Sequence, residues 1–251
     1  MTIREGKPRE SFLETGAAIL HMMRRVSLRR VPGTLGVAVW LLLLAAASPT
    51  FGQAHLRPCP PVSERTGEPG PTCSTASQKL GRLPQGPIFW HLDTYPTRAA
   101  AEAAKGPRGT VVESLGKIWL FTIAEAGWRP SGGERVAEIG PLPVKPDTEY
   151  TAVYLESIFD PGMTAPVHTH SGPEAFYTLT GETCLEVPDG VLRERGDSHA
   201  IVVPSGPPML LTAAGTVRRR GVVLILHDSS QPATTMGSDW TPKGLCKTSP
   251  R

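Results

Sequence analysis

The chain has 251 residues, with 26 Gly, 26 Pro and a formal net charge of +3. Glycine and proline make up about a fifth of it, which suits short strands joined by turns and excludes a helical bundle. Seven basic and three acidic residues lie in 1–54, so the remainder has 19 basic and 20 acidic residues. This near balance, without a basic stripe, predicts that nucleic acid is not a partner.

Residues 1–54 predict a secretory signal peptide with a short N-terminal extension. A basic stretch, Met23–Arg30, precedes an apolar run at Val37–Ala47, and small residues at Gly52 and Ala54 offer a cleavage site. The apolar run is shorter than the ~20 residues of a comfortable membrane span. Cleavage near Ala54 would leave a secreted or periplasmic protein. The alternative is an uncleaved segment that anchors the chain to the membrane.

Residues 55–85 are rich in Pro, Gly, Ser and Thr, and we expect an irregular arm there. Four cysteines follow the predicted cleavage site, and an even number in an exported chain predicts two disulfides, with three pairings open. A Cys59–Cys73 bridge would close a loop of about 15 residues, worth about 3 kcal/mol in the chain-entropy model. A Cys184–Cys246 bridge would tie the C-terminal tail to the domain before it.

Residues 86–147 predict a β/α lobe that packs on the domain after it. Residues 87–93, 110–115 and 117–123 have the composition of strands, and a short helix follows Thr97, a plausible N-cap. The alternative for 86–150 is a degenerate second barrel.

Residues 148–228 contain six or more short strands, a density typical of a small barrel. The runs 174–180 and 183–187 predict a hairpin turning at Gly181-Glu182. The cluster Arg218–Arg220 lies between two strands and favours a solvated turn over an anion site. Residues 229–251 predict an extended C-terminal tail on the surface.

Residues 162–181 contain the side chains that indicate a chemistry. His168 and His170 are two apart, so on a strand both rings point to the same face. Gly172-Pro173 breaks that strand, and Glu174 opens the next apolar run. Phe176 has the same strand parity as Glu174, so we expect it beside the site. Two imidazoles and one carboxylate make a three-ligand metal site with open positions.

The spacing G-x5-H-x-H-x3-E-x6-G is complete at Gly162, His168, His170, Glu174 and Gly181. It resembles the first motif of the cupin superfamily. The resemblance implies an all-β fold, a double-stranded β-helix of the jelly-roll type over 148–228, with the β/α lobe as an N-terminal extension. It also implies one metal ion inside the barrel.

The second cupin motif is incomplete. The family pattern looks like G-x(5–7)-P-x-G-x2-H-x3-N, and this chain has Gly196, Pro204 and Gly206 but Met209 where the last histidine is expected. Met209 can pack as an apolar residue and leave water to complete the site, or act as a fourth, soft ligand that favours copper. It can also mark a degenerate site. His199 and His227 are candidate substitutes.

Three functions fit these features. The first is an exported cupin that binds a divalent ion of iron, manganese, zinc or copper through His168, His170 and Glu174. The second is a metal-dependent oxygenase or isomerase acting on a small molecule. The third is a non-catalytic small-molecule-binding or scaffold cupin, and a homodimer is compatible with each.

Overall fold

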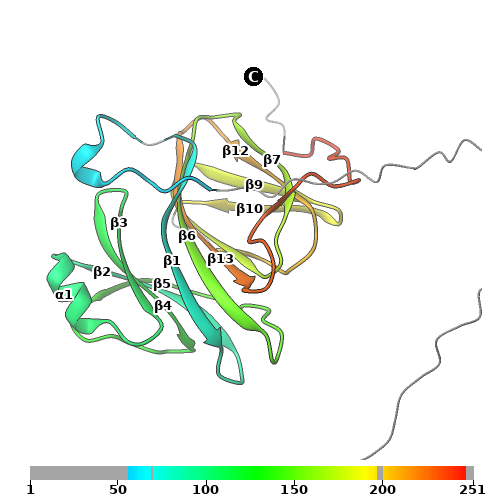
Figure 1. The fold of residues 1–251 in the computed structure, drawn as a ribbon. Coiled ribbons are helices and arrows are strands. Elements are labelled where there is room, and N and C mark those ends of the chain that lie inside the picture. Colours follow the sequence, from blue (N-terminus) through cyan, green and yellow to red (C-terminus); the bar gives the residue numbers. More distant parts are fainter. Residues whose placement is uncertain (1–55, 69, 197–199, 247–251) are drawn as a thin grey trace, which may run out of the picture. The chain divides into compact units, whose positions relative to one another are not determined.

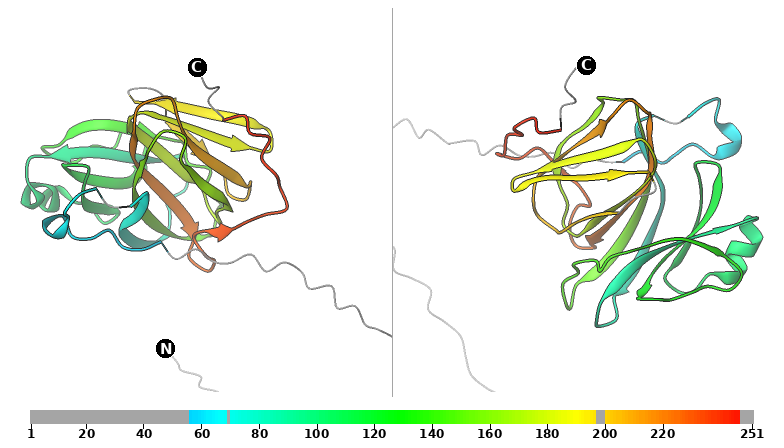
Figure 2. Two further views of the ribbon diagram at one scale, coloured as in Figure 1. Left: turned by 90° about the horizontal axis from the view of Figure 1, so that it is seen from above. Right: turned by 180° about the vertical axis from the view of Figure 1, so that it is seen from behind.

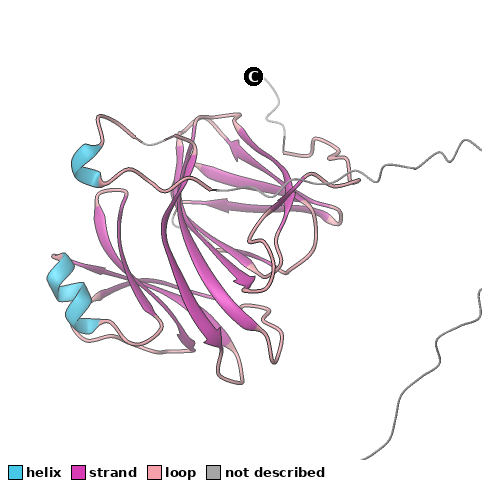
Figure 3. Cartoon of the chain, viewed as in Figure 1, coloured by secondary structure: helices cyan, strands magenta, loops and turns pink. Residues whose placement is uncertain are grey.

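A computed structural model describes residues 56–68, 70–196 and 200–246. This part of the chain consists almost entirely of strands, arranged in three antiparallel sheets (Figures 1 and 3). The predicted signal peptide lies outside the described residues. In the ranges that are described, no helix is both long and apolar enough to cross a bilayer.

Two five-stranded sheets face each other and form the barrel (Figure 2). The first has the order β1-β6-β13-β8-β11, with strands β1 (Thr72–Arg82), β6 (Glu149–Phe159), β13 (Arg219–Asp228), β8 (Glu174–Thr180) and β11 (Ile201–Val203). The second has the order β10-β9-β12-β7-β14, with strands β10 (Gly190–Arg195), β9 (Glu182–Val187), β12 (Met209–Ala214), β7 (Thr164–Thr169) and β14 (Thr235–Met236).

The eight strands from β6 to β13 have the strand order of a jelly roll. Numbered along the chain, they lie in the order first, eighth, third, sixth in one sheet and fifth, fourth, seventh, second in the other. In a jelly roll the chain crosses repeatedly between two facing sheets, so every strand has one face toward the interior. The predicted double-stranded β-helix fold is therefore confirmed.

Strand parity decides what each face of the first sheet buries. On β6, Tyr150 and Tyr154 belong to the apolar cluster shared with the lobe, whereas Leu155 and Phe159 belong to the cluster inside the barrel. On β13, every residue of 222–226 is buried, because both faces of that strand are covered. This accounts for an uninterrupted apolar run where a half-exposed strand would alternate.

The lobe is a four-stranded sheet with one helix at its side. Its order is β3-β4-β2-β5, and its elements are β2 (Ile88–Tyr95), α1 (Arg98–Ala104), β3 (Gly109–Ser114), β4 (Lys117–Glu125) and β5 (Glu134–Ile139). The Thr97 Oγ1 caps the helix by accepting from the Ala100 N–H at 3.1 Å, as expected. Trp90 and Phe121 pack on Tyr154 of the barrel sheet. The sheet is open, so the alternative of a second barrel is wrong.

The prediction of an irregular arm over 55–85 is wrong for Thr72–Arg82. This stretch is β1, which pairs with β6 along its length, after the 3₁₀ helix at Val62–Glu64. The strand is at the edge of its sheet and its side chains are mostly polar and partly exposed, so it lacks the apolar alternation that marks a strand in sequence.

The predicted hairpin of 174–180 with 183–187 is also wrong. β8 pairs with β13 and β11, whereas β9 pairs with β12 and β10 in the other sheet. Gly181 carries the chain across at a φ of 75°, in the left-handed region that favours glycine. Its turn chemistry suits a hairpin equally well, and only the distant partners β12 and β13 decide between the two arrangements.

Two disulfides hold the ends of the described chain. Cys59 is bonded to Cys73, and Cys184 is bonded to Cys246, so one of the three open pairings is now assigned. Two disulfides fit an extracellular or periplasmic protein. The C-terminal tail does more than lie on the surface, because β14 adds a short strand beside β7.

Candidate metal centre

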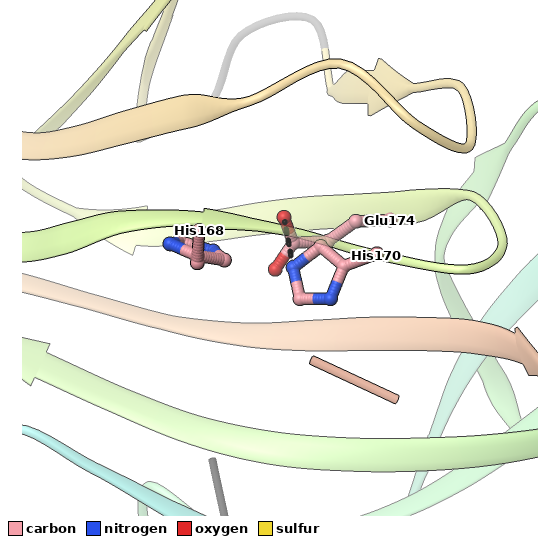
Figure 4. Close-up of side chains that lie close together, drawn as sticks. All are labelled: His168, His170 and Glu174. Atoms are coloured by element: carbon pink, nitrogen blue, oxygen red, sulfur yellow. Dashed lines mark ion pairs between the residues drawn. The ribbon is translucent and has the colours of Figure 1, made fainter. Parts of the chain in front are cut away.

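The three predicted ligands lie together inside the barrel (Figure 4). His168 is on β7, His170 directly follows that strand, and Glu174 opens β8 in the facing sheet. One ligand atom from each residue lies within 4.8 Å of the others. Donors on one bound ion are about 3–4 Å apart, given bond lengths of about 2.0–2.2 Å. The group is thus assembled but somewhat wider than a closed coordination shell.

Backbone carbonyls orient both imidazole rings. The Nδ1 of His168 lies 2.7 Å from the carbonyl oxygen of Pro166, and the Nδ1 of His170 lies 2.7 Å from that of Ala233. A carbonyl can only accept, so in the neutral form of each ring Nδ1 carries the proton and Nε2 has the free lone pair. Metal-ligating histidines are commonly oriented by such a contact.

Two other atoms of the site, His170 Nε2 and Glu174 Oε2, are buried without hydrogen bonds. The Nε2 of His170 lies 3.3 Å from Oε2 of Glu174, yet neither atom is aligned for a hydrogen bond (Figure 4). Burial lowers the pKa of His170, but the neighbouring Glu174 carboxylate outweighs this and leaves that pKa raised. Burial also lowers the pKa of His168, and the Glu174 charge offsets this only in part, so that pKa stays below its usual value. Unsatisfied buried polar atoms are costly, and a shared cation would satisfy them.

A cavity of about 120 Å³ adjoins the three ligands. Phe176 lines it, as its strand parity predicted, beside apolar residues of β6 and β13 and Thr234 and Met236 of the tail. A larger cleft of about 590 Å³ lies between residues 59–65 and β3. Among the described residues, however, His168, His170 and Glu174 are the one group of three His, Cys, Asp or Glu residues that could hold an ion.

Met209 occupies the register position that the second motif predicts. Its Cα is paired with that of His168 across β12 and β7, and the side chain is 1% exposed in the apolar cluster of the barrel. It does not line the cavity, so the structure favours the packing role among the three alternatives. The Nδ1 of His227 lies 2.8 Å from the carbonyl oxygen of Asp228, as expected of a loop histidine. His199 lies outside the described residues.

The environment predicted for Arg219 is wrong. A solvated turn is expected at 218–220, but Arg219 begins β13 and its side chain is completely buried. It donates to Thr183 Oγ1 at 2.5 Å and to Ser157 Oγ at 2.8 Å, and its Nη2 has no hydrogen-bond partner. From the sequence, the side chain of Arg219 could be placed on the inner face only by alternation along a strand. That requires knowing that β13 already begins at Arg219.

Two of the solved structures to which the chain is similar are small β-sheet proteins. The chain is similar to a cupin superfamily protein from Desulfitobacterium hafniense, with 16% identity over 35% of this chain and 74% of that one and a TM-score of 0.29. A protein with a double-stranded β-helix domain from Klebsiella pneumoniae is 15% identical over 43% of this chain and 84% of that one, with a TM-score of 0.30. The order of the strands in the two facing sheets is what defines the fold as a double-stranded β-helix.

A third similar structure is described as a DMSP lyase, from Ruegeria pomeroyi. It is 16% identical to this chain over 39% of it, with a TM-score of 0.29, and the match spans 45% of that enzyme. No family model and no curated protein matches the sequence. Likeness at this level carries no information about the chemistry, which depends on the side chains of the site.

Proposed function

We propose that this protein is an exported metal-binding cupin in which His168, His170 and Glu174 hold one divalent ion. The observation that carries the proposal is the pair of buried, unsatisfied atoms, His170 Nε2 and Glu174 Oε2, beside an imidazole whose Nδ1 is already engaged. Two imidazole nitrogens and one carboxylate oxygen fit iron, manganese, zinc or copper, and leave coordination positions open. A bound ion would supply Lewis-acid or redox chemistry at the cavity.

An enzymatic role as an oxygenase or isomerase is the second candidate, and the cavity favours it. The cavity's volume of about 120 Å³ is below the roughly 300–1,000 Å³ of typical ligand pockets, so a substrate would have to be very small. Its wall is mostly apolar around the polar ligand group. His168, His170 and Glu174 would orient the ion, while Phe176 and its apolar neighbours would exclude water. A non-catalytic binding or scaffold role is supported if metal binds but no substrate turns over.

Loss of any ligand should abolish metal binding. We expect stoichiometric metal in the loaded parent and little in His168→Ala, His170→Ala or Glu174→Gln, measured by elemental analysis after dialysis. Metal at about 100 times its Kd should stabilise the parent by about 2.7 kcal/mol, seen as a chelator-sensitive rise in Tm, and should leave the variants unmoved.

His227→Ala is the matched control, because His227 is a half-buried histidine bonded to its own loop. It should retain the metal and the rise in Tm. The proposed centre would be overturned if the parent held no metal after loading, or if His227→Ala lost as much metal as the ligand variants. Only the fold would then remain.

A further inference from the structure

The C-terminal tail passes along the metal centre in a fixed position. At one end the Ser171 hydroxyl donates to the carbonyl oxygen of Pro232 at 2.9 Å, and at the other the Gly237 N–H donates to that of Val167 at 2.8 Å. Between these contacts, β14 pairs with β7, the strand that carries His168. The tail is therefore a wall of the site with defined register.

That register puts methionine on both sides of His168. Met236 on β14 is one Cα partner of His168, and Met209 on β12 is the other. Side chains of directly opposed residues share a face of the sheet, with Cβ atoms about 4.5–5.5 Å apart. Of the two, Met236 lines the cavity beside His168, whereas Met209 packs in the apolar cluster.

Met236 adds a thioether to the lining of this cavity. It is half-buried and lines the same cavity as His168, His170 and Glu174. Its three rotatable bonds let a methionine sulfur adapt its position to a neighbouring ion. All four cysteines are in disulfides, so this thioether has no thiolate competing with it.

We propose that Met236 supplies a thioether ligand to this centre and thereby makes it a copper site that also holds Cu(I). Thioethers are soft ligands that select Cu(I) over manganese, iron(II) or zinc, and imidazole suits copper in both oxidation states. The inference rests on the proposed metal centre and names the metal and a ligand that lies outside both cupin motifs.

The test compares two isosteric variants of the full chain. Anaerobic competition with a colorimetric Cu(I) chelator gives the Cu(I) affinity, and a parallel zinc competition reports the rest of the site. Met236→Leu should weaken Cu(I) binding by about tenfold or more, the loss seen even for residues that only orient ligands. Its zinc affinity should stay within about twofold. Met209→Leu, the matched control of similar volume, should change neither affinity.

X-ray absorption of the Cu(I)-loaded protein gives a second readout. The parent and Met209→Leu should show a sulfur neighbour of copper that Met236→Leu lacks, while the Tm of the metal-free variants confirms that each one folds. Unchanged Cu(I) affinity in Met236→Leu, or an equal loss in Met209→Leu, would overturn the inference. If zinc binds normally in that case, the proposed centre survives, whereas a parent that binds neither ion refutes both.

Discussion

At the scale of single residues, the barrel interior holds a buried network of polar and ionisable groups besides the proposed metal ligands. Arg219 bonds Thr183 Oγ1, Thr183 contacts Thr178 Oγ1 at 2.7 Å, and Thr178 donates to Glu194 Oε2 at 2.9 Å. The guanidinium and the carboxylate are thus linked through two hydroxyls. Burial raises the pKa of Glu194 to about 7 and lowers the pKa of Arg219 to about 10.

Glu194 should make stability fall as pH rises toward neutrality. Between its ordinary pKa of 4.5 and about 7, this carboxyl is ionised in the unfolded chain but protonated in the fold. The folded state therefore binds more protons, and stability is lost across that window. Glu194→Gln cannot ionise and should remove this loss, on the order of 2–3 kcal/mol, or roughly 5–10 °C in Tm between about pH 5 and about pH 8.

Thermal unfolding across that pH range decides the matter. Glu113→Gln, a half-exposed carboxylate on β3, is the control and should follow the parent. The same pH dependence in Glu194→Gln as in the parent would contradict the assignment of the proton to Glu194.

At the scale of elements, the turn between β7 and β8 sets the spacing of the ligands. Gly172-Pro173 carries the chain from one sheet to the other between His170 and Glu174. The backbone of β13 lies directly against Gly172, where a Cβ would come 1.9 Å from the carbonyl oxygen of Leu226. Only glycine fits there without a shift of the backbone. The close contact therefore fixes the turn, and with it the positions of the proposed ligands His170 and Glu174.

Gly172→Ala should therefore reduce metal affinity as well as stability. The backbone must shift to relieve the clash, at a cost of about 1–3 kcal/mol, and His170 and Glu174 move with it. Metal competition and denaturant unfolding measure the two effects. Gly162→Ala is the comparison, because it is strained by its φ of 83° but meets no neighbouring atom. It should lose stability yet bind metal like the parent, and an equal affinity loss there would refute the local explanation.

At the scale of the whole molecule, the two disulfides and the predicted leader point to the same compartment. Cys59–Cys73 holds the chain just after the predicted cleavage site, and Cys184–Cys246 holds its far end. Glu186 stabilises that end as well, accepting from the N–H groups of Gly244 at 3.1 Å and Leu245 at 2.9 Å. Disulfide bonds persist in oxidising compartments and seldom in the cytosol.

We expect the mature protein to begin near His55 and to be found in the periplasm or outside the cell. N-terminal sequencing of protein from its native host, with fractionation of the cells, tests this. Two disulfides should then be detected by thiol counting with and without reductant. A chain that keeps residues 30–50 and sediments with membranes would instead be an anchored protein.

Features that depend on neighbouring residues could be predicted from the sequence. The H-x-H spacing places His168 and His170 on one face because strands have a period of two, and Gly172-Pro173 ends that strand. The helix after Thr97 and the inward direction of Phe176 follow from equally local rules. The jelly-roll fold was predicted from the resemblance to a family motif, because the sequence of a single strand does not specify which strands it pairs with.

Only the tertiary structure decided which distant segments complete the site. Gly181 suits a hairpin or a crossing between sheets, and pairing with β12 and β13 selects the crossing. β1 lacks the apolar alternation that marks a strand in sequence, and only its pairing with β6 shows it to be one. Met236 has no local signal at all, and it reaches His168 through the register of β14 on β7. Local geometry is encoded within a few residues, whereas pairing depends on contacts that form only once the whole chain has folded.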